Sequence, residues 1–145
     1  MSTIETIDWC LAFDTGIPEI DLQHRILINK FNGISSRLRN GGDLTGWEHA
    51  AYEVLSYALY HFSTEEKLAE RYGYDREAVA EALSHKEDHQ SFTQYIEQVR
   101  DRLQSGKHVP PGELLHFAGD WLLKHIAHSD HQLGAFINAK QKAGL

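Results

Sequence analysis

A histidine and a glutamate stand four residues apart at His61 and Glu65, within an apolar and aromatic stretch of the chain. Four residues make a little more than one turn of an α-helix, about 400° of rotation, so both side chains would leave a helix on one face. An imidazole and a carboxylate buried on one face are suited to bind a metal ion. A surface pair, or a core histidine held by a carboxylate, would show the same spacing, so this pair alone does not establish a site.

Histidines that share a face with apolar residues also occur in three other segments. His24 precedes Leu27 by three residues, His85 and His89 are again four apart, and His125 follows an apolar run at helical spacing. Each buried imidazole needs partners, and one shared cation would satisfy all of them together. The sequence therefore predicts a metal centre to which four helices contribute.

Asp130 is the remaining candidate ligand, five residues after His125. On a straight α-helix five residues correspond to about 500°, which would leave the two side chains roughly 140° apart. We therefore expect the helix to bend, bulge or end near Ala127–Ser129 if both residues bind. His128 and His131 are the competing candidates, and their positions predict that they face outward.

The elements that must position these residues are helices. Apolar residues recur at spacings of three, four and seven, and glycine and proline mark the boundaries. An extended N-terminal arm should precede helices at roughly 18–40, 44–72, 75–104 and 110–128, and a short segment at 130–141 should follow. Asp43 or Thr45 and Asp75 are the expected caps of the second and third helices. Such helices bury their apolar faces most economically as an all-α, antiparallel, up-down-up-down four-helix bundle, here a single domain over 1–145.

Composition excludes several functional classes. The formal net charge of -7 argues against nucleic acid and anionic membranes as partners, because both require a basic surface. The single cysteine, Cys10, cannot form an intramolecular disulfide, and the N-terminus shows neither a secretory signal nor an apolar run of spanning length. We expect a cytoplasmic protein, without membrane insertion, that is a monomer and whose protein partner is unknown.

These residues together resemble the hemerythrin family, and most closely its single-domain bacterial members, the bacteriohemerythrins. The resemblance runs in order from about Trp9 to Gly134. The stretch between Glu65 and His85 is a few residues longer than is usual in the family, and Ala69 stands where many relatives carry a bulkier methionine. The motifs that carry the resemblance are Ile20-Asp21-Leu22-Gln23-His24, His61-Phe62-x-x-Glu65-Glu66, His85-x-x-x-His89-x-x-Phe92, and Trp121-Leu122-x-x-His125-Ile126-x-x-x-Asp130-x-x-Leu133-Gly134.

The resemblance implies a cofactor of two non-haem iron ions, bridged by an oxo or hydroxo group and by two carboxylates. It would assign His85, His89 and His125 to one iron, His24 and His61 to the other, and Glu65 and Asp130 to both. One coordination position would then stay open for dioxygen, and Trp121 and Leu122 match the positions that line the oxygen pocket of the family.

Reversible binding of dioxygen, as a carrier, store or supplier, is the function that this resemblance implies, and the protein would not be an enzyme. Sensing of oxygen, nitric oxide or redox state through the same site is the alternative. A di-iron oxidase or peroxidase is a further alternative, but such bundle enzymes use Glu-rich patterns with paired Glu-x-x-His motifs. Metal storage is a weaker candidate, because one closed site holds few ions.

Overall fold

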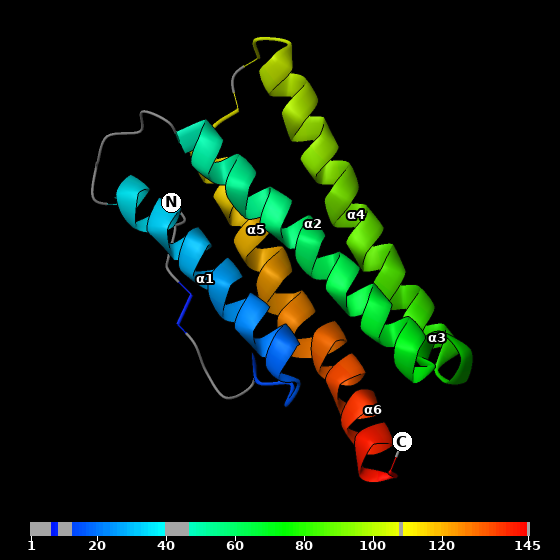
Figure 1. The fold of residues 1–145 in the computed structure, drawn as a ribbon. Helices are drawn as coiled ribbons and strands as arrows, with labels where there is room; N and C mark the ends of the chain where they lie inside the picture. The colour runs from blue at the N-terminus through cyan, green and yellow to red at the C-terminus, as the bar shows by residue number, and fades with distance from the viewer. Residues whose placement is uncertain (1–6, 9–12, 40–46, 108, 145) are drawn as a thin grey trace.

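The computed structural model describes residues 7–8, 13–39, 47–107 and 109–144, and within them it contains helices and no strand. Four rods lie side by side, and the chain passes along consecutive rods in opposite directions (Figure 1). The rods are α1 (Pro18–Arg39), α2 (Trp47–Tyr72), α4 (Val79–Gln104), and a continuous stack of α5 (Pro111–Lys124), η2 (His125–Asp130) and α6 (His131–Lys142). The predicted all-α bundle is confirmed. None of the described helices is both long and apolar enough to cross a membrane.

The start of α1 is held by the carboxylate of Asp21. It accepts hydrogen bonds from the Thr15 backbone N–H at 2.9 Å, the Thr15 hydroxyl at 2.7 Å and the Gly16 N–H at 3.2 Å. Gly16 has a φ of 82°, a left-handed conformation that favours glycine. Pro18 occupies the first position of the helix, where its missing N–H costs nothing. This anchored turn sets the position of His24 further along the same helix.

The N-terminal arm packs against α1 where it is described. The Ile7 N–H donates to Asn32 Oδ1 at 2.6 Å, and the Asn32 amide donates back to the Ile7 carbonyl at 2.7 Å. Ile7 and Phe13 are both buried. The other predicted arm residues at 9–12 lie outside the described part of the chain, as do the predicted caps and loop at 40–46.

The predicted helix at 75–104 differs from the structure at its N-terminal end. A four-residue helix, α3 (Tyr74–Glu77), precedes α4, and Ala78 interrupts them with φ −119° and ψ 60°. Asp75, the expected cap, lies inside α3. The turn is set by Gly73, whose φ of 80° ends α2, and by burial of the Tyr74 side chain. This extra helical turn accommodates the long connection between α2 and α4.

Two apolar clusters lie on either side of a polar layer. Along α1, His24 falls between Ile20, which belongs to the smaller cluster, and Leu27, which belongs to the larger one. The same order occurs on α4, where His85 and His89 lie between a residue of the smaller cluster and one of the larger. The bundle therefore carries its histidines in one layer, sealed by hydrocarbon at both ends.

Candidate metal centre

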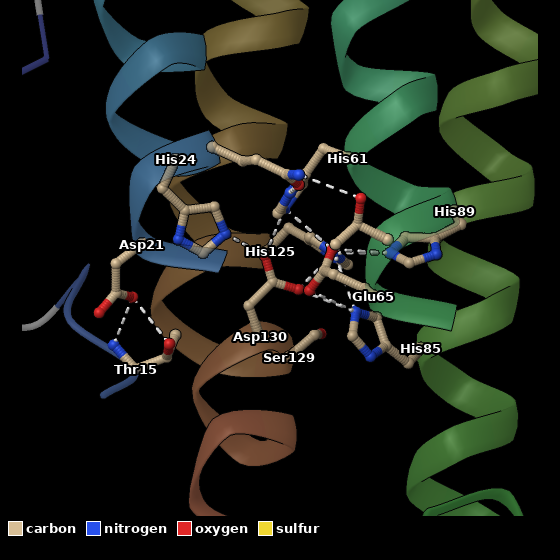
Figure 2. Close-up of polar contacts among 12 residues, drawn as sticks. Thr15, Asp21, His24, His61, Glu65, His85, His89, His125, Ser129 and Asp130 are labelled. Carbon is tan, nitrogen blue, oxygen red and sulfur yellow. Dashed lines mark hydrogen bonds and ion pairs between the residues drawn. The ribbon is translucent and has the colours of Figure 1, made fainter. Parts of the chain in front are cut away.

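The seven side chains predicted as metal ligands meet at the centre of the bundle (Figure 2). All are buried, and the most accessible exposes 5% of its surface. They are His24 from α1, His61 and Glu65 from α2, His85 and His89 from α4, and His125 and Asp130 from η2. The structure thus brings the whole predicted set together, and their role as ligands stays a prediction.

The seven residues form two groups of converging donor atoms. One consists of His85, His89 and His125 with both carboxylates, and the other of His24 and His61 with the same two carboxylates. Within each group the donor atoms lie within 4.8 Å of one another. We call these the three-histidine group and the two-histidine group. Glu65 and Asp130 belong to both.

Asp130 divides its oxygens between the groups. Its Oδ1 lies 2.8 Å from Nε2 of His85 and 2.8 Å from Nε2 of His125. Its Oδ2 lies 2.7 Å from Nε2 of His24 and 3.4 Å from Nε2 of His61. A carboxylate that presents one oxygen to each of two donor groups is oriented as a bridge.

Glu65 also reaches both groups. Its Oε1 lies 2.9 Å from Nε2 of His61 and 3.4 Å from Nε2 of His89, and its Oε2 lies 3.5 Å from Nε2 of His85. Neither oxygen of Glu65 has a hydrogen-bond partner among the described residues, although both are fully buried. A buried carboxylate surrounded by imidazole nitrogens, but not hydrogen-bonded to them, fits a cation between the groups.

The imidazole nitrogens themselves approach one another closely. His125 Nε2 lies 3.1 Å from His85 Nε2 and 3.0 Å from His89 Nε2. A ring nitrogen carries one proton or one lone pair, so the three cannot satisfy one another by hydrogen bonds. Ligands at right angles around an ion, with bonds of about 2.1 Å, would lie about 3.0 Å apart. The spacing of the nitrogens therefore fits a shared metal ion, and imidazole with carboxylate suits iron.

The helix irregularity predicted between His125 and Asp130 is confirmed. α5 ends at Lys124, before the residue 128 expected from the sequence, and the six residues of η2 form a π-helix before α6 begins. A π-helix joins residues five apart by hydrogen bonds, so side chains at that spacing align. Both Asp130 and His125 consequently face the centre, while His128 and His131 are exposed.

The outward nitrogen of His61 has a neutral partner. His61 Nδ1 lies 2.8 Å from Gln23 Oε1, and Gln23 Nε2 donates to the Thr64 hydroxyl at 3.0 Å. The Thr64 hydroxyl in turn donates to the Tyr60 carbonyl at 3.3 Å. Because the amide nitrogen of Gln23 is used by Thr64, its oxygen accepts from His61 Nδ1–H. With a metal ion bound, Nε2 of His61 would therefore direct its lone pair to the centre.

Two histidines of the three-histidine group have carboxylate neighbours instead. His89 Nδ1 donates to Glu66 Oε2 at 3.2 Å. His125 Nδ1 lies 3.7 Å from Asp88 Oδ2, which also accepts a hydrogen bond from Ser129 Oγ at 2.9 Å. The sequence assigned no role to these two carboxylates or to Gln23, although Gln23 and Glu66 stand within the motifs that carry the resemblance.

The predicted pocket residues lie in different surroundings. The Trp121 ring stacks on His125 with ring centroids 4.3 Å apart and an interplanar angle of 17°. Leu122 is buried in the larger apolar cluster. Trp121 therefore borders the three-histidine group, and a role for either residue in a dioxygen pocket stays a prediction.

Electrostatics in the metal-free protein keeps the cluster charged. Burial lowers the pKa of His61 and of His85, but the neighbouring carboxylates outweigh it and raise each pKa to about 9. Burial and the charge of Asp130 raise the pKa of Glu65, yet the imidazoles outweigh both and hold it well below its usual range. Burial likewise raises the pKa of Asp130, but the charge of His125 and the hydrogen bonds from His125 and His24 outweigh it and hold that pKa well below its usual range.

The stability of the metal-free protein should fall as the pH rises from about 6.5 to about 9. In this window folded His61 and His85 hold protons that the unfolded chain releases, so folding is favoured below pH 6.5 and that advantage is lost towards pH 9. Glu65 and Asp130 stay ionised in folded and unfolded chains throughout this window, so they do not change the slope. Thermal unfolding followed by circular dichroism should show a decrease of about 5 °C or more.

The metal-loaded protein is the control for this prediction. Its imidazoles would hold ions instead of protons, so its melting temperature should not show the same decrease between pH 6.5 and 9. A metal-free protein whose stability is constant or rises over this range would contradict the charge state assigned to the cluster.

Comparison with known proteins agrees with the site. The sequence profile of the hemerythrin HHE cation-binding domain matches residues 15–137. A bacteriohemerythrin of Pseudomonas aeruginosa is 30% identical over 149 residues, which cover 94% of this chain and 90% of that protein. A bacteriohemerythrin of Stenotrophomonas maltophilia is 32% identical over 136 residues, covering 90% and 81%. One of Clostridium acetobutylicum is 28% identical over 130 residues, covering 86% and 95%. No solved structure matches at a significant level.

The match extends over nearly the whole bundle and includes every residue of the buried centre. The profile describes a cation-binding domain, and the buried histidines and carboxylates indicate metal binding independently of it. The chain belongs to the hemerythrin family.

Proposed function

We propose that the chain binds dioxygen reversibly at two non-haem iron ions, bridged by Glu65, Asp130 and a solvent-derived oxo or hydroxo group. The three-histidine group would hold one ion and the two-histidine group the other. The observation that carries this proposal is the pair of donor groups that share both carboxylates. When bound, the iron pair supplies the electrons that dioxygen takes up and gives back.

The two groups offer unequal numbers of protein donors. One provides three imidazoles and the other two, and both draw on the same two carboxylates. The two-histidine group therefore leaves more room for a ligand from solution. This inequality supports binding of a small molecule at one end of the pair, rather than a closed structural site.

The protein shields the two carboxylates of the centre from solvent. Glu65 and Asp130 have no exposed surface. Phe62 stacks on His89 with centroids 4.1 Å apart and an interplanar angle of 13°, and Trp121 covers His125 in the same way. Dry surroundings disfavour the escape of reduced oxygen species and so favour the return of intact dioxygen. We accordingly propose binding without catalytic turnover.

An absorption experiment tests this function. The iron-loaded protein is reduced anaerobically, exposed to oxygen and then deoxygenated, and its visible spectrum should change and revert over several cycles. The same protein stripped of iron by a chelator should show no change. Stoichiometric release of hydrogen peroxide, or turnover of an added reductant, would contradict reversible binding and favour an oxidase or peroxidase. A partner protein whose affinity differs between the oxygenated and reduced forms would favour sensing.

A further inference from the structure

The outward faces of the histidines differ in charge between the two groups. In the three-histidine group, the carboxylate of Glu66 accepts from His89 Nδ1 at 3.2 Å, and the carboxylate of Asp88 lies 3.7 Å from His125 Nδ1. The second distance is too long for a hydrogen bond, so Asp88 acts on His125 through its charge. Ser129 holds Asp88 in place by donating to the same oxygen at 2.9 Å.

The two-histidine group has no charged neighbour of this kind among the described residues. His61 Nδ1 meets the amide oxygen of Gln23, which the buried Thr64 hydroxyl keeps in that orientation. His24 Nδ1 is buried without any hydrogen-bond partner in the described part of the chain. The imidazoles of this group are therefore backed by a neutral amide and by hydrocarbon.

A carboxylate behind a ligating imidazole changes the metal ion in front of it. It makes the imidazole a stronger electron donor, and its negative charge favours an ion of higher positive charge. Glu66 and Asp88 are each 43% exposed, so solvent screens part of this effect. Neither forms an ion pair with a lysine or arginine among the described residues, so their charge is not cancelled by a fixed cation.

We propose that Glu66 and Asp88 are positioning residues that act through His89 and His125. They make the three-histidine position the tighter site for iron and the first to be oxidised, while Gln23 leaves the two-histidine position less electron-rich. The two halves of the pair thus differ in charge as well as in donor number. This inference rests on the proposed function only in requiring that two ions bind.

Substitutions that remove charge and keep shape test the inference. In Glu66→Gln and Asp88→Asn the new side chain can still accept a hydrogen bond, so the negative charge alone is lost. The controls are Glu70→Gln and Glu87→Gln, which remove exposed carboxylates from the same two helices. Gln23→Glu adds a carboxylate behind His61 and should act in the opposite direction on the reduction potential.

The readouts are the reduction potential of the iron-loaded full-length chain, by spectroelectrochemistry, and retention of iron against a competing chelator. Glu66→Gln and Asp88→Asn should each raise the potential and weaken retention of one iron about tenfold. Potentials and retention equal to those of Glu70→Gln and Glu87→Gln would overturn the inference.

A wild-type chain that holds two irons but does not bind dioxygen would refute the proposed function and leave this comparison of potentials valid. A wild-type chain that cannot hold two irons would refute both.

Discussion

Replacing Glu65 with glutamine should leave a folded chain that no longer holds a pair of iron ions. Glutamine keeps the volume of the fully buried side chain, but it offers one ligating oxygen instead of two and carries no charge. Glu65 lies within 3.5 Å of His61, His85 and His89, so its loss affects both donor groups. Loss of a residue that hydrogen-bonds to a metal ligand lowers metal affinity by up to roughly 100-fold. Glu65 would itself be a ligand, so its replacement should lower the affinity for iron by more than this.

Iron per chain, measured by elemental analysis after passage over a chelating resin, is the readout. Glu70→Gln is the matched control, because Glu70 lies on the same helix and is exposed. Circular dichroism of both variants reports whether the bundle is intact. Two irons per chain in a folded Glu65→Gln protein, together with reversible oxygen binding, would show that Glu65 does not bridge the ions.

Much of this site could be predicted from the sequence because helical spacing is a local property. His85 and His89 share a face whatever the partner helix is, and so do His61 and Glu65. The apolar stripes on the same faces direct these residues inward. Burial of unpaired imidazoles then requires a common partner, which is why their convergence could be expected before the fold was seen.

The features that escaped prediction depend on tertiary packing. Glu66 and Asp88 stand beside ligands in the sequence, but only the closeness of α2, α4 and η2 brings them to the backs of His89 and His125. The interruption at Ala78 also has no clear local signal, because alanine is a strong helix former. It arises from the left-handed turn at Gly73 and the burial of the tyrosine that follows it.

The π-helix links the fold to the site, because it lets one rod bury the apolar faces of α5 and α6 and also direct both His125 and Asp130 to the centre. Five turns of a regular α-helix take about 18 residues, which would bring Phe136 into line with Ala118. In the structure Ala118 and Ile137 are buried, and Phe136 is only half-buried. Between the buried residues Ala118 and Ile137 the rod therefore contains one residue more than a regular α-helix would place there. The π-helix η2 accommodates this extra residue and aligns His125 with Asp130.

Deleting Ala127 should accordingly be tolerated, whereas deleting Leu123 should cost the protein iron. Both residues are exposed and lie in the same rod, so each deletion removes one residue without emptying the core. Without Ala127, η2 can become a regular α-helix with His125 and Asp130 four residues apart and still on one face. Without Leu123, a regular helix forms only if His125 and Ile126 each move one position toward the N-terminus. This shift turns their side chains about 100° away from their present directions.

Iron content and thermal unfolding of the two deletion variants distinguish these outcomes. The Ala127 deletion should keep both irons and melt within a few degrees of the parent, because the faces of α5 and α6 stay in phase. The Leu123 deletion should lose iron from the three-histidine group, because it moves His125, which is 4% exposed in the parent, to the solvent-exposed position that Lys124 holds in the parent. Equal loss of iron in both variants would mean that the centre needs the π-helix itself and not only the alignment of His125 with Asp130.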